Sequence, residues 1–357
     1  MHPTLLEQTV RDVMPAARER VDVHASTAFE LLVALFALGS ERPSGAPPWL
    51  PASLAECSPA LRRALERVGV RAGELWLHLL GLALELRPPT TAEFVDRLGR
   101  VDALDLRRHM LGVHVPAWRT VAGVETLERA ARGSSAAASE LLANETYYAG
   151  RARESLERVL ALTPAQTKRV LLAVLRRFVD EVFAAHEQEV GALIRQDATR
   201  TAALATSLSR EALIAAATGG YVYEPEPEFD LVVLAPHVAA RPWLLLCQHR
   251  DARIICYPAG GDGSSDDVAG RALRLGVALA DERRVQMLRR LAAGEATLGE
   301  LAETTGLAKS TAHHHVAHLR AAGLVTLRGN ARGYWYSLRL EGLTESRELL
   351  AALLMPP

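Results

Sequence analysis

The spacing of apolar positions predicts consecutive helices over residues 28–217. Apolar side chains recur there at intervals of three or four residues, which is the period of one helix face. Residues 31–38 are one example, and a longer stripe covers residues 170–183. Stretches rich in glycine and proline separate these segments, and no fixed-period repeat connects them. The first part of the chain is therefore expected to be a region of short helices.

A different pattern begins after residue 218. Three β-like runs occupy residues 229–234, 243–247 and 253–257, and the last two are expected to form a hairpin. Residues 260–267 are rich in Gly, Ser and Asp, which is the composition of a flexible linker. A small β-hairpin or sheet segment is thus predicted over residues 219–259, ahead of the linker.

From residue 268 onward the pattern predicts helix, turn, helix and two short strands. One long helix is expected over residues 268–293. The sequence Thr297-Leu298-Gly299-Glu300 then has the form of a capping box, in which the threonine and glutamate side chains satisfy amides at a helix start. Gly306 is suited to the left-handed residue that ends a helix. This order is typical of a winged helix-turn-helix, whose second helix enters the DNA major groove.

The second helix of this motif, residues 309–322, has one narrow apolar stripe formed by Ala312, Val316 and Leu319. Its opposite face carries small or polar side chains, namely Lys309, Ser310, Thr311, His313, His314, Ala317 and Arg320. Ala308 cannot cap the helix, and Lys309 places a cation at the positive end of the helix dipole. Both features become favourable opposite an anion, so this face is expected to meet DNA; a merely solvated face is the alternative.

The two strands after this helix are predicted to form a basic wing. Residues 324–327 and 334–338 are β-rich and enclose the sequence Arg-Gly-Asn-Ala-Arg-Gly at residues 328–333. Arg328 and Arg332 are suited to contact phosphates or a minor groove. Ordinary solubilising charges are the alternative for both arginines.

Charge is distributed unevenly along the chain. Residues 271–357 contain 12 Lys and Arg against 8 Asp and Glu, a balance of +4, and the remaining 29 and 34 give −5. The surplus of cations in the C-terminal part is compatible with DNA binding without requiring it. No long apolar run or signal-like start is present, so we expect a cytoplasmic protein without membrane association.

Residues 300–325, ELAETTGLAKSTAHHHVAHLRAAGLV, resemble the helix-turn-helix of ArsR-type bacterial repressors. The resemblance implies that Lys309, Ser310, His313 and His314 face bases or phosphates. It also implies a homodimer formed by the helix before the motif and a terminal helix over residues 345–354. Residues 233–258 are similar to those of long actinobacterial relatives that have an uncharacterised N-terminal domain.

The chain departs from the metal-sensing members of that family. They have a Cys-x-Cys pair in the helix before the turn, and residues 298–305 contain no cysteine. The terminal helix has acidic residues but no histidine. The resemblance therefore implies a regulator that lacks the usual metal site, and we expect no cofactor.

Cysteine and histidine residues suggest one further candidate site. If the hairpin turns about Asp251 and Ala252, Cys247 and Cys256 become cross-strand neighbours with His249 on the same face. Such a set could be a redox pair or half of a metal site. Buried cysteines that serve only as small apolar side chains are the commoner alternative.

These observations together predict a mainly α protein with a C-terminal winged helix-turn-helix. The expected parts are a helical domain (1–218), a β segment (219–259), a linker (260–267) and a DNA-binding domain (268–357). The predicted function is that of a non-enzymatic transcription regulator, expected to be a repressor. It would bind a double-stranded DNA operator as a homodimer, with the N-terminal region sensing an unknown small-molecule effector or adding dimer surface. The alternative is a helical ligand-binding or enzymatic protein whose winged helix mediates protein contacts only.

Overall fold

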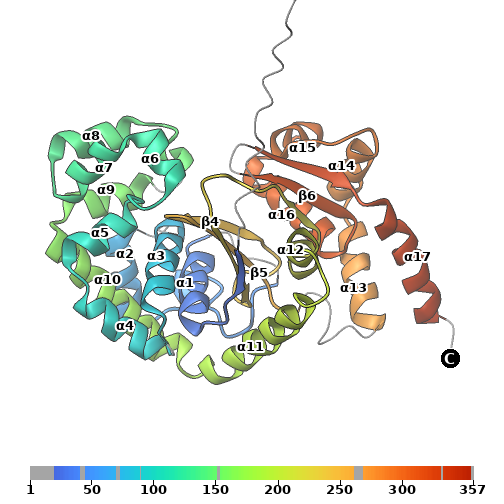
Figure 1. Cartoon of the computed structure of the whole chain (residues 1–357), viewed down its shortest axis with the longest axis horizontal. Coiled ribbons are helices and arrows are strands. Elements are labelled where there is room, and N and C mark those ends of the chain that lie inside the picture. The colour runs from blue at the N-terminus through green and yellow to red at the C-terminus, as the bar shows by residue number, and fades with distance from the viewer. Residues whose placement is uncertain are drawn as a thin grey trace, which may run out of the picture.

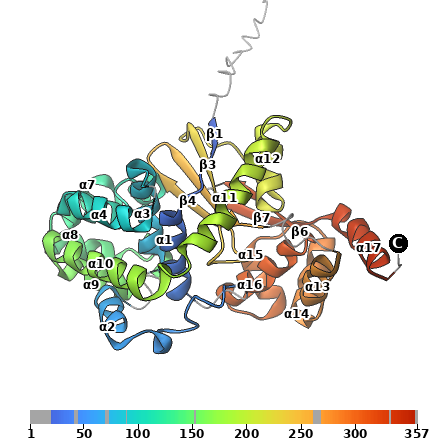
Figure 2. The same cartoon turned by 90° about the horizontal axis from the view of Figure 1, so that it is seen from below.

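The computed structural model describes residues 20–40, 45–69, 73–88, 90–150, 153–260, 268–330 and 333–354. Helices of the first part of the chain form one end of the molecule, and the C-terminal helices form the other (Figure 1). A sheet lies between these two ends in both views (Figures 1 and 2). Within the described ranges, the helices all fall short of the length and apolar character that crossing a membrane requires.

The predicted helical region is confirmed. Several of its helices begin at a side-chain cap, in which Ser58, Thr90, Asp102, Thr163 or Ser209 accepts a hydrogen bond from a first-turn amide. The region contains α1 (Thr27–Leu38), α2 (Pro59–Val68), α3 (Gly73–Leu86), α4 (Thr91–Arg100), α5 (Ala103–Met110), α6 (Pro116–Ala122), α7 (Val124–Ala131), α8 (Ser135–Ala143), α9 (Arg153–Ala161), α10 (Pro164–Phe178), α11 (Glu187–Leu204) and α12 (Arg210–Thr218), with the short turns η1 (Leu54–Glu56), η2 (Tyr147–Gly150) and η3 (Val179–Phe183).

The central sheet has the order β1 (Arg20–Val23), β3 (Leu231–His237), β5 (Ala252–Pro258) and β4 (Leu245–His249). The first three strands are parallel, and β4 is antiparallel to β5. Side chains along β3 and β5 alternate between two apolar cores, because successive residues of a strand face opposite sides. Val233 and Ile254 belong to the core of the helical region, whereas Val232 and Ile255 belong to a core shared with the winged-helix residues. The sheet therefore joins the two ends of the molecule.

The hairpin of β4 and β5 is present, but the predicted register is wrong. Its turn consists of Arg250 and Asp251, so that His249 pairs with Ala252 and Cys247 lies opposite Ile254. Arg250 adopts a φ of 50°, and a positive φ of this kind allows a tight two-residue hairpin turn. The expected direct pairing of Cys247 with Cys256 is consequently absent, because a shift of the turn by one residue changes every cross-strand partner.

The C-terminal part has the predicted winged helix-turn-helix order. It contains α13 (Val268–Leu279), α14 (Glu282–Ala292), α15 (Leu298–Thr305), α16 (Lys309–Ala321), β6 (Val325–Asn330), β7 (Gly333–Leu338) and α17 (Leu340–Leu354). The single long helix expected over residues 268–293 is instead two helices. Asp281 interrupts it, because its side chain accepts a hydrogen bond from the backbone amide of Arg284 at 3.1 Å and so starts α14.

A strand from the N-terminal part joins the wing. β2 (Tyr221–Tyr223) pairs in parallel with β6, and the resulting sheet has the order β2-β6-β7. The Tyr221 hydroxyl also donates a hydrogen bond to the carbonyl of Gly329 at 2.8 Å. Residues 219–259 thus contribute strands to two different sheets. The predicted linker falls almost wholly on residues 261–267, which lie outside the described part of the chain.

Candidate nucleic-acid interface

The turn between α15 and α16 has the geometry that its sequence predicts. The Thr297 hydroxyl accepts a hydrogen bond from the Glu300 amide, and the Glu300 carboxylate accepts one from the Thr297 amide at 2.7 Å. Gly306 closes α15 in the left-handed conformation with a φ of 65°. The predicted apolar stripe of α16 is buried against the rest of the motif. These contacts determine how α16 is oriented.

The first turn of α16 is open to solvent. Its N-cap is Ala308, and no side chain accepts a hydrogen bond from the first-turn amides at this position. Lys309 and Ser310 are exposed, and the first turn contains no acidic residue. The first-turn amides and the lysine together form a positive helix end, which is a suitable place for a phosphate.

The central residues of α16 are less accessible than the first turn. Thr311, His313 and His314 are half-buried. The Trp243 ring lies 4.9 Å from the His314 ring in an edge-on arrangement and 6.3 Å from the His313 ring, measured between centroids. Trp243 precedes β4 and thus comes from outside the helix-turn-helix. This neighbour cannot be predicted from the sequence of α16, because no residue local to the helix indicates it.

Arg320 does not lie where the sequence analysis expected it. Its side chain is buried and donates hydrogen bonds to the carbonyls of Thr218 at 2.7 Å and Pro242 at 3.3 Å. Burial lowers the pKa of Arg320 to about 10. The expectation that this guanidinium faces DNA is therefore corrected, because it packs against two carbonyl oxygens of the N-terminal part.

The wing differs from the predicted loop. β6 continues through Arg328 to Asn330, and β7 already starts at Gly333, so Arg328 lies on a strand instead of in a loop. Arg328 is exposed and pairs with Glu295 at 3.7 Å. Gly329 has a φ of 136°, which a side chain would disfavour. Arg332, the second predicted wing cation, lies outside the described residues.

The candidate thiol or metal site does not form. Burial raises the pKa of the Cys247 thiol to about 12 and that of Cys256 well above its ordinary value, which disfavours the reactive thiolate. The His249 Nε2 atom lies 2.7 Å from the Glu85 carboxylate and so is not directed toward the cysteines. In the described ranges, no group of three or more His, Cys, Asp and Glu residues is arranged to hold a metal ion.

His249 instead belongs to a histidine cluster in the helical region, which the sequence analysis missed. The His109 ring lies 4.4 Å from the His114 ring and 5.3 Å from the His249 ring. Burial lowers the pKa of His109 to about 2 and that of His114 to about 4. His249 lies on β4, far along the chain from His109 and His114, so only the folded chain brings it to them.

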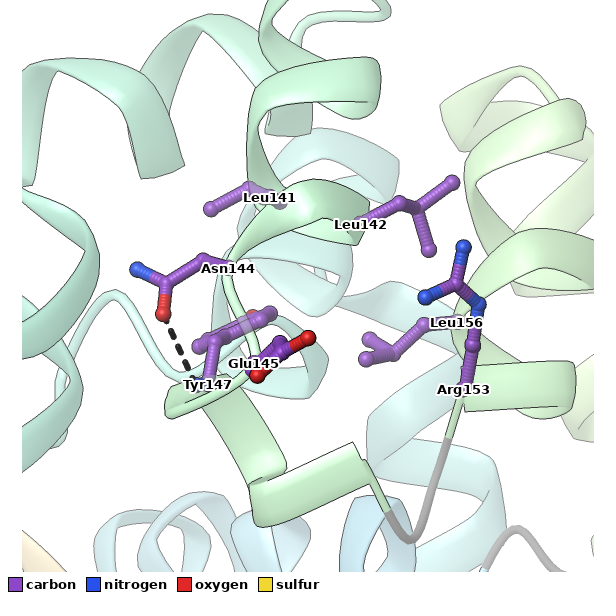
Figure 3. A pocket seen from close by; sticks show the side chains of 7 residues that line it. All are labelled: Leu141, Leu142, Asn144, Glu145, Tyr147, Arg153 and Leu156. Atoms are coloured by element: carbon purple, nitrogen blue, oxygen red, sulfur yellow. Dashed lines mark hydrogen bonds between the residues drawn. The ribbon is translucent and has the colours of Figure 1, made fainter.

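A surface pocket of about 370 Å³ lies in the helical region, at the end of the molecule opposite α16 (Figures 1 and 3). Its lining comes from α8, α9 and the segment between them. The lining residues are Leu141, Leu142, Asn144, Glu145, Tyr147, Arg153 and Leu156. Trp76 is buried in the core and does not line this pocket.

Comparisons with known proteins match the C-terminal part of the chain. The family described as "Bacterial regulatory protein, arsR family" matches residues 281–326. The transcriptional activator HlyU of Vibrio cholerae serotype O1 is 36% identical over 85 residues, which are 24% of this chain and 79% of HlyU. The structure of reduced HlyU from Vibrio cholerae N16961 matches at 36% identity and a TM-score of 0.20, covering 25% of this chain and 93% of that one.

Proposed function

Because the chain belongs to the ArsR family of bacterial regulatory proteins, we propose that it regulates transcription by binding an operator in double-stranded DNA through α16 and the wing. The observation that carries this proposal is the uncapped first turn of α16, where exposed Lys309 and Ser310 surround a positive helix end. A phosphate at this place satisfies the free amides and the lysine together.

Each predicted contact has a distinct role in the proposed complex. Lys309 and Ser310 hold phosphates, while Thr311, His313 and His314 face base edges in the major groove. Arg328 and Arg332 of the wing contact the adjacent backbone. Arg320 is left out of the interface because it is buried against the N-terminal part.

We further propose that α13 and α17 form a homodimer interface. The two helices pack together. They also expose apolar side chains, with Leu273 71% and Leu354 77% accessible. Exposed apolar side chains gathered on packed helices are typical of a surface that another protein covers. A second copy is the natural partner, because a dimer places two reading helices on one operator.

The N-terminal region is proposed to sense a small-molecule effector. An effector that binds one arrangement of the molecule better than another shifts the equilibrium between them and so alters operator affinity. We propose a non-enzymatic, cytoplasmic repressor, since a protein bound over a promoter blocks access to it. A reporter assay with and without the protein tests whether transcription is repressed or activated. Repression predicts lower reporter expression in the presence of the protein, and higher expression would indicate activation.

Selection of duplexes from random-sequence DNA tests the function as a whole. The protein is expected to retain specific sequences, with an affinity that falls steeply as salt is added because phosphate contacts release counterions. The second candidate function is a winged helix that serves protein contacts only. The packing of α16 against Trp243 favours that candidate. Failure to retain any duplex, or an affinity independent of salt, would support it.

A further inference from the structure

The outer face of α16 beyond its first turn is partly covered by the N-terminal part of the chain. Ala317 is 4% exposed and Arg320 is 7% exposed, although neither belongs to the apolar stripe that packs on the helix-turn-helix. Ala317 belongs to the same apolar core as the helical region, together with Trp243. Both α16 residues owe their burial to the N-terminal part and would face solvent without it.

Residues 238–243, here called the covering loop, contact α16 through Pro242 and Trp243. Pro242 accepts a hydrogen bond from Arg320, and Trp243 lies edge-on to His314. Thr218, at the end of α12, accepts the other Arg320 hydrogen bond. The covering loop thus occupies the side of α16 that lies between its first turn and its C-terminal end.

The covering loop is held by the helical region. The backbone amides of Val238 and Ala239 donate hydrogen bonds to the Glu30 carboxylate on α1, at 2.9 and 2.8 Å. The Trp243 ring also packs edge-on against Phe36 of α1, with 5.9 Å between centroids. Because Glu30 and Phe36 of α1 hold the covering loop, a displacement of α1 would move the loop with it.

DNA and the covering loop compete for one surface. A helix that reads bases must lie in the major groove with its outer face against the base edges. Trp243 already packs against His313 and His314, two of the proposed base-contacting residues. We propose that the covering loop is an autoinhibitory contact, and that operator DNA binds only when the loop and α16 separate. This inference rests on the proposed function of α16.

Separation of the loop is then the step at which an effector acts. The apparent dissociation constant equals the intrinsic one divided by the fraction of molecules in the competent, separated state. A ligand of the helical region that moves α1 raises this fraction and tightens DNA binding. A ligand that holds α1 in place has the opposite effect.

The test compares full-length variants on a fluorescent duplex selected from random-sequence DNA. Trp243→Ala removes the ring from α16 and is expected to tighten binding by about tenfold or more, since the closed state loses its main contact. Trp118→Ala is the matched control, because Trp118 packs on Tyr147 and Tyr148, away from the covering loop. Should Trp243→Ala fail to fold, Arg320→Met removes the hydrogen bond to Pro242 of the covering loop, together with the one to Thr218, and is expected to act in the same direction.

Hydrogen exchange provides a readout that does not depend on affinity. Adding the duplex is expected to increase amide exchange in residues 238–243 of the wild-type protein while residues 309–321 stay protected. Unchanged exchange in the covering loop on DNA binding, with equal affinities for all variants, would overturn the inference and leave the proposed function intact. If Trp243→Ala exposes α16 to exchange yet no variant binds any duplex, the proposed function itself is wrong and the inference is overturned with it.

Discussion

At the scale of single residues, the cations of α16 have opposite environments. Lys309 is exposed at the helix start, whereas Arg320 is buried against carbonyl oxygens. Both were predicted to face DNA from the same polar face of one helix. Of these two cations, only Lys309 is exposed to an external anion. Replacing Lys309 should therefore weaken DNA binding, whereas replacing Arg320 should tighten it.

Replacing Lys309 by Ala is expected to weaken operator binding by about 1.5 kcal/mol, or roughly tenfold, because one charge-assisted phosphate contact is lost. The slope of log affinity against log salt should also become shallower by about one. Fluorescence anisotropy at several salt concentrations measures both quantities. Arg132→Ala, which removes an exposed cation near the far end of the helical region, is the control. Equal behaviour of the two variants would argue against the proposed docking.

The buried histidines predict a pH dependence of stability. Burial lowers the pKa of His78 to about 4, of His109 to about 2, of His114 to about 4 and of His237 to about 3. Unfolded histidines titrate near pH 6.5, so the unfolded state binds more protons below that value. The free energy of unfolding is therefore expected to decrease as the pH falls from about 6.5 toward 4. Each histidine lowers it by on the order of 1 kcal/mol for each pH unit.

Glu30 opposes this trend. Burial raises the pKa of Glu30 to about 7. Its contribution to stability is therefore fully present below the pKa of an unfolded glutamate, and it is lost as the pH rises from that pKa toward 7. Four histidines outweigh one glutamate, and the net effect remains destabilisation by acid. Urea unfolding measured at pH 7, 6 and 5 checks the sign. A free energy of unfolding that stays constant or increases toward pH 5 would contradict it.

At the scale of elements, capping residues and apolar stripes predicted the helices well. The sequence did not predict which strands pair with each other. The capping box at Thr297 and the glycine turn at Gly306 are both present as predicted. The break at Asp281 was missed, although Asp is a common N-cap, because the apolar pattern continues across it. β2 was missed as well, since three residues that pair with a distant strand have too short a pattern to identify.

The exposed faces of α13 and α17 predict a concentration-dependent dimer. Replacing Leu350 and Leu353 together by Glu is expected to raise the dimer dissociation constant by about 100-fold or more, since each buried leucine contributes about 1.5 kcal/mol. Light scattering over a range of concentrations measures the assembly state. Val124→Glu on α7 is the control for an exposed apolar residue outside this surface. A wild-type protein that stays monomeric at every concentration would refute the interface.

At the scale of the whole molecule, the central sheet connects the helical region with the winged-helix part. Alternate side chains of β3 and β5 enter two cores, and one of these cores includes residues of the winged helix-turn-helix. β2 and Arg320 add two further connections. The two ends are therefore coupled through packed elements, which is what regulation of α16 from the helical region requires.

This shared packing predicts a single cooperative unfolding transition for the full chain. Unfolding of the winged-helix part would break the pairing of β2 with β6 and open the apolar core that it shares with α12 and the central sheet, so the two parts are expected to lose structure together. Calorimetry combined with circular dichroism measures whether the transitions coincide. Two separate transitions, with the winged-helix part unfolding first, would show that the sheet does not couple them.

The amino-acid sequence by itself determined the helices, their caps and the helix-turn-helix, because these depend on residues only a few positions apart. It also identified the exposed, uncapped start of α16 at Ala308 and Lys309. The tertiary structure alone decided the hairpin register, the histidine cluster and the covering of α16 by Trp243. The physical reason is that a polar or small residue such as Arg320 or Ala317 has no local feature that distinguishes an exposed face from one buried by a distant segment.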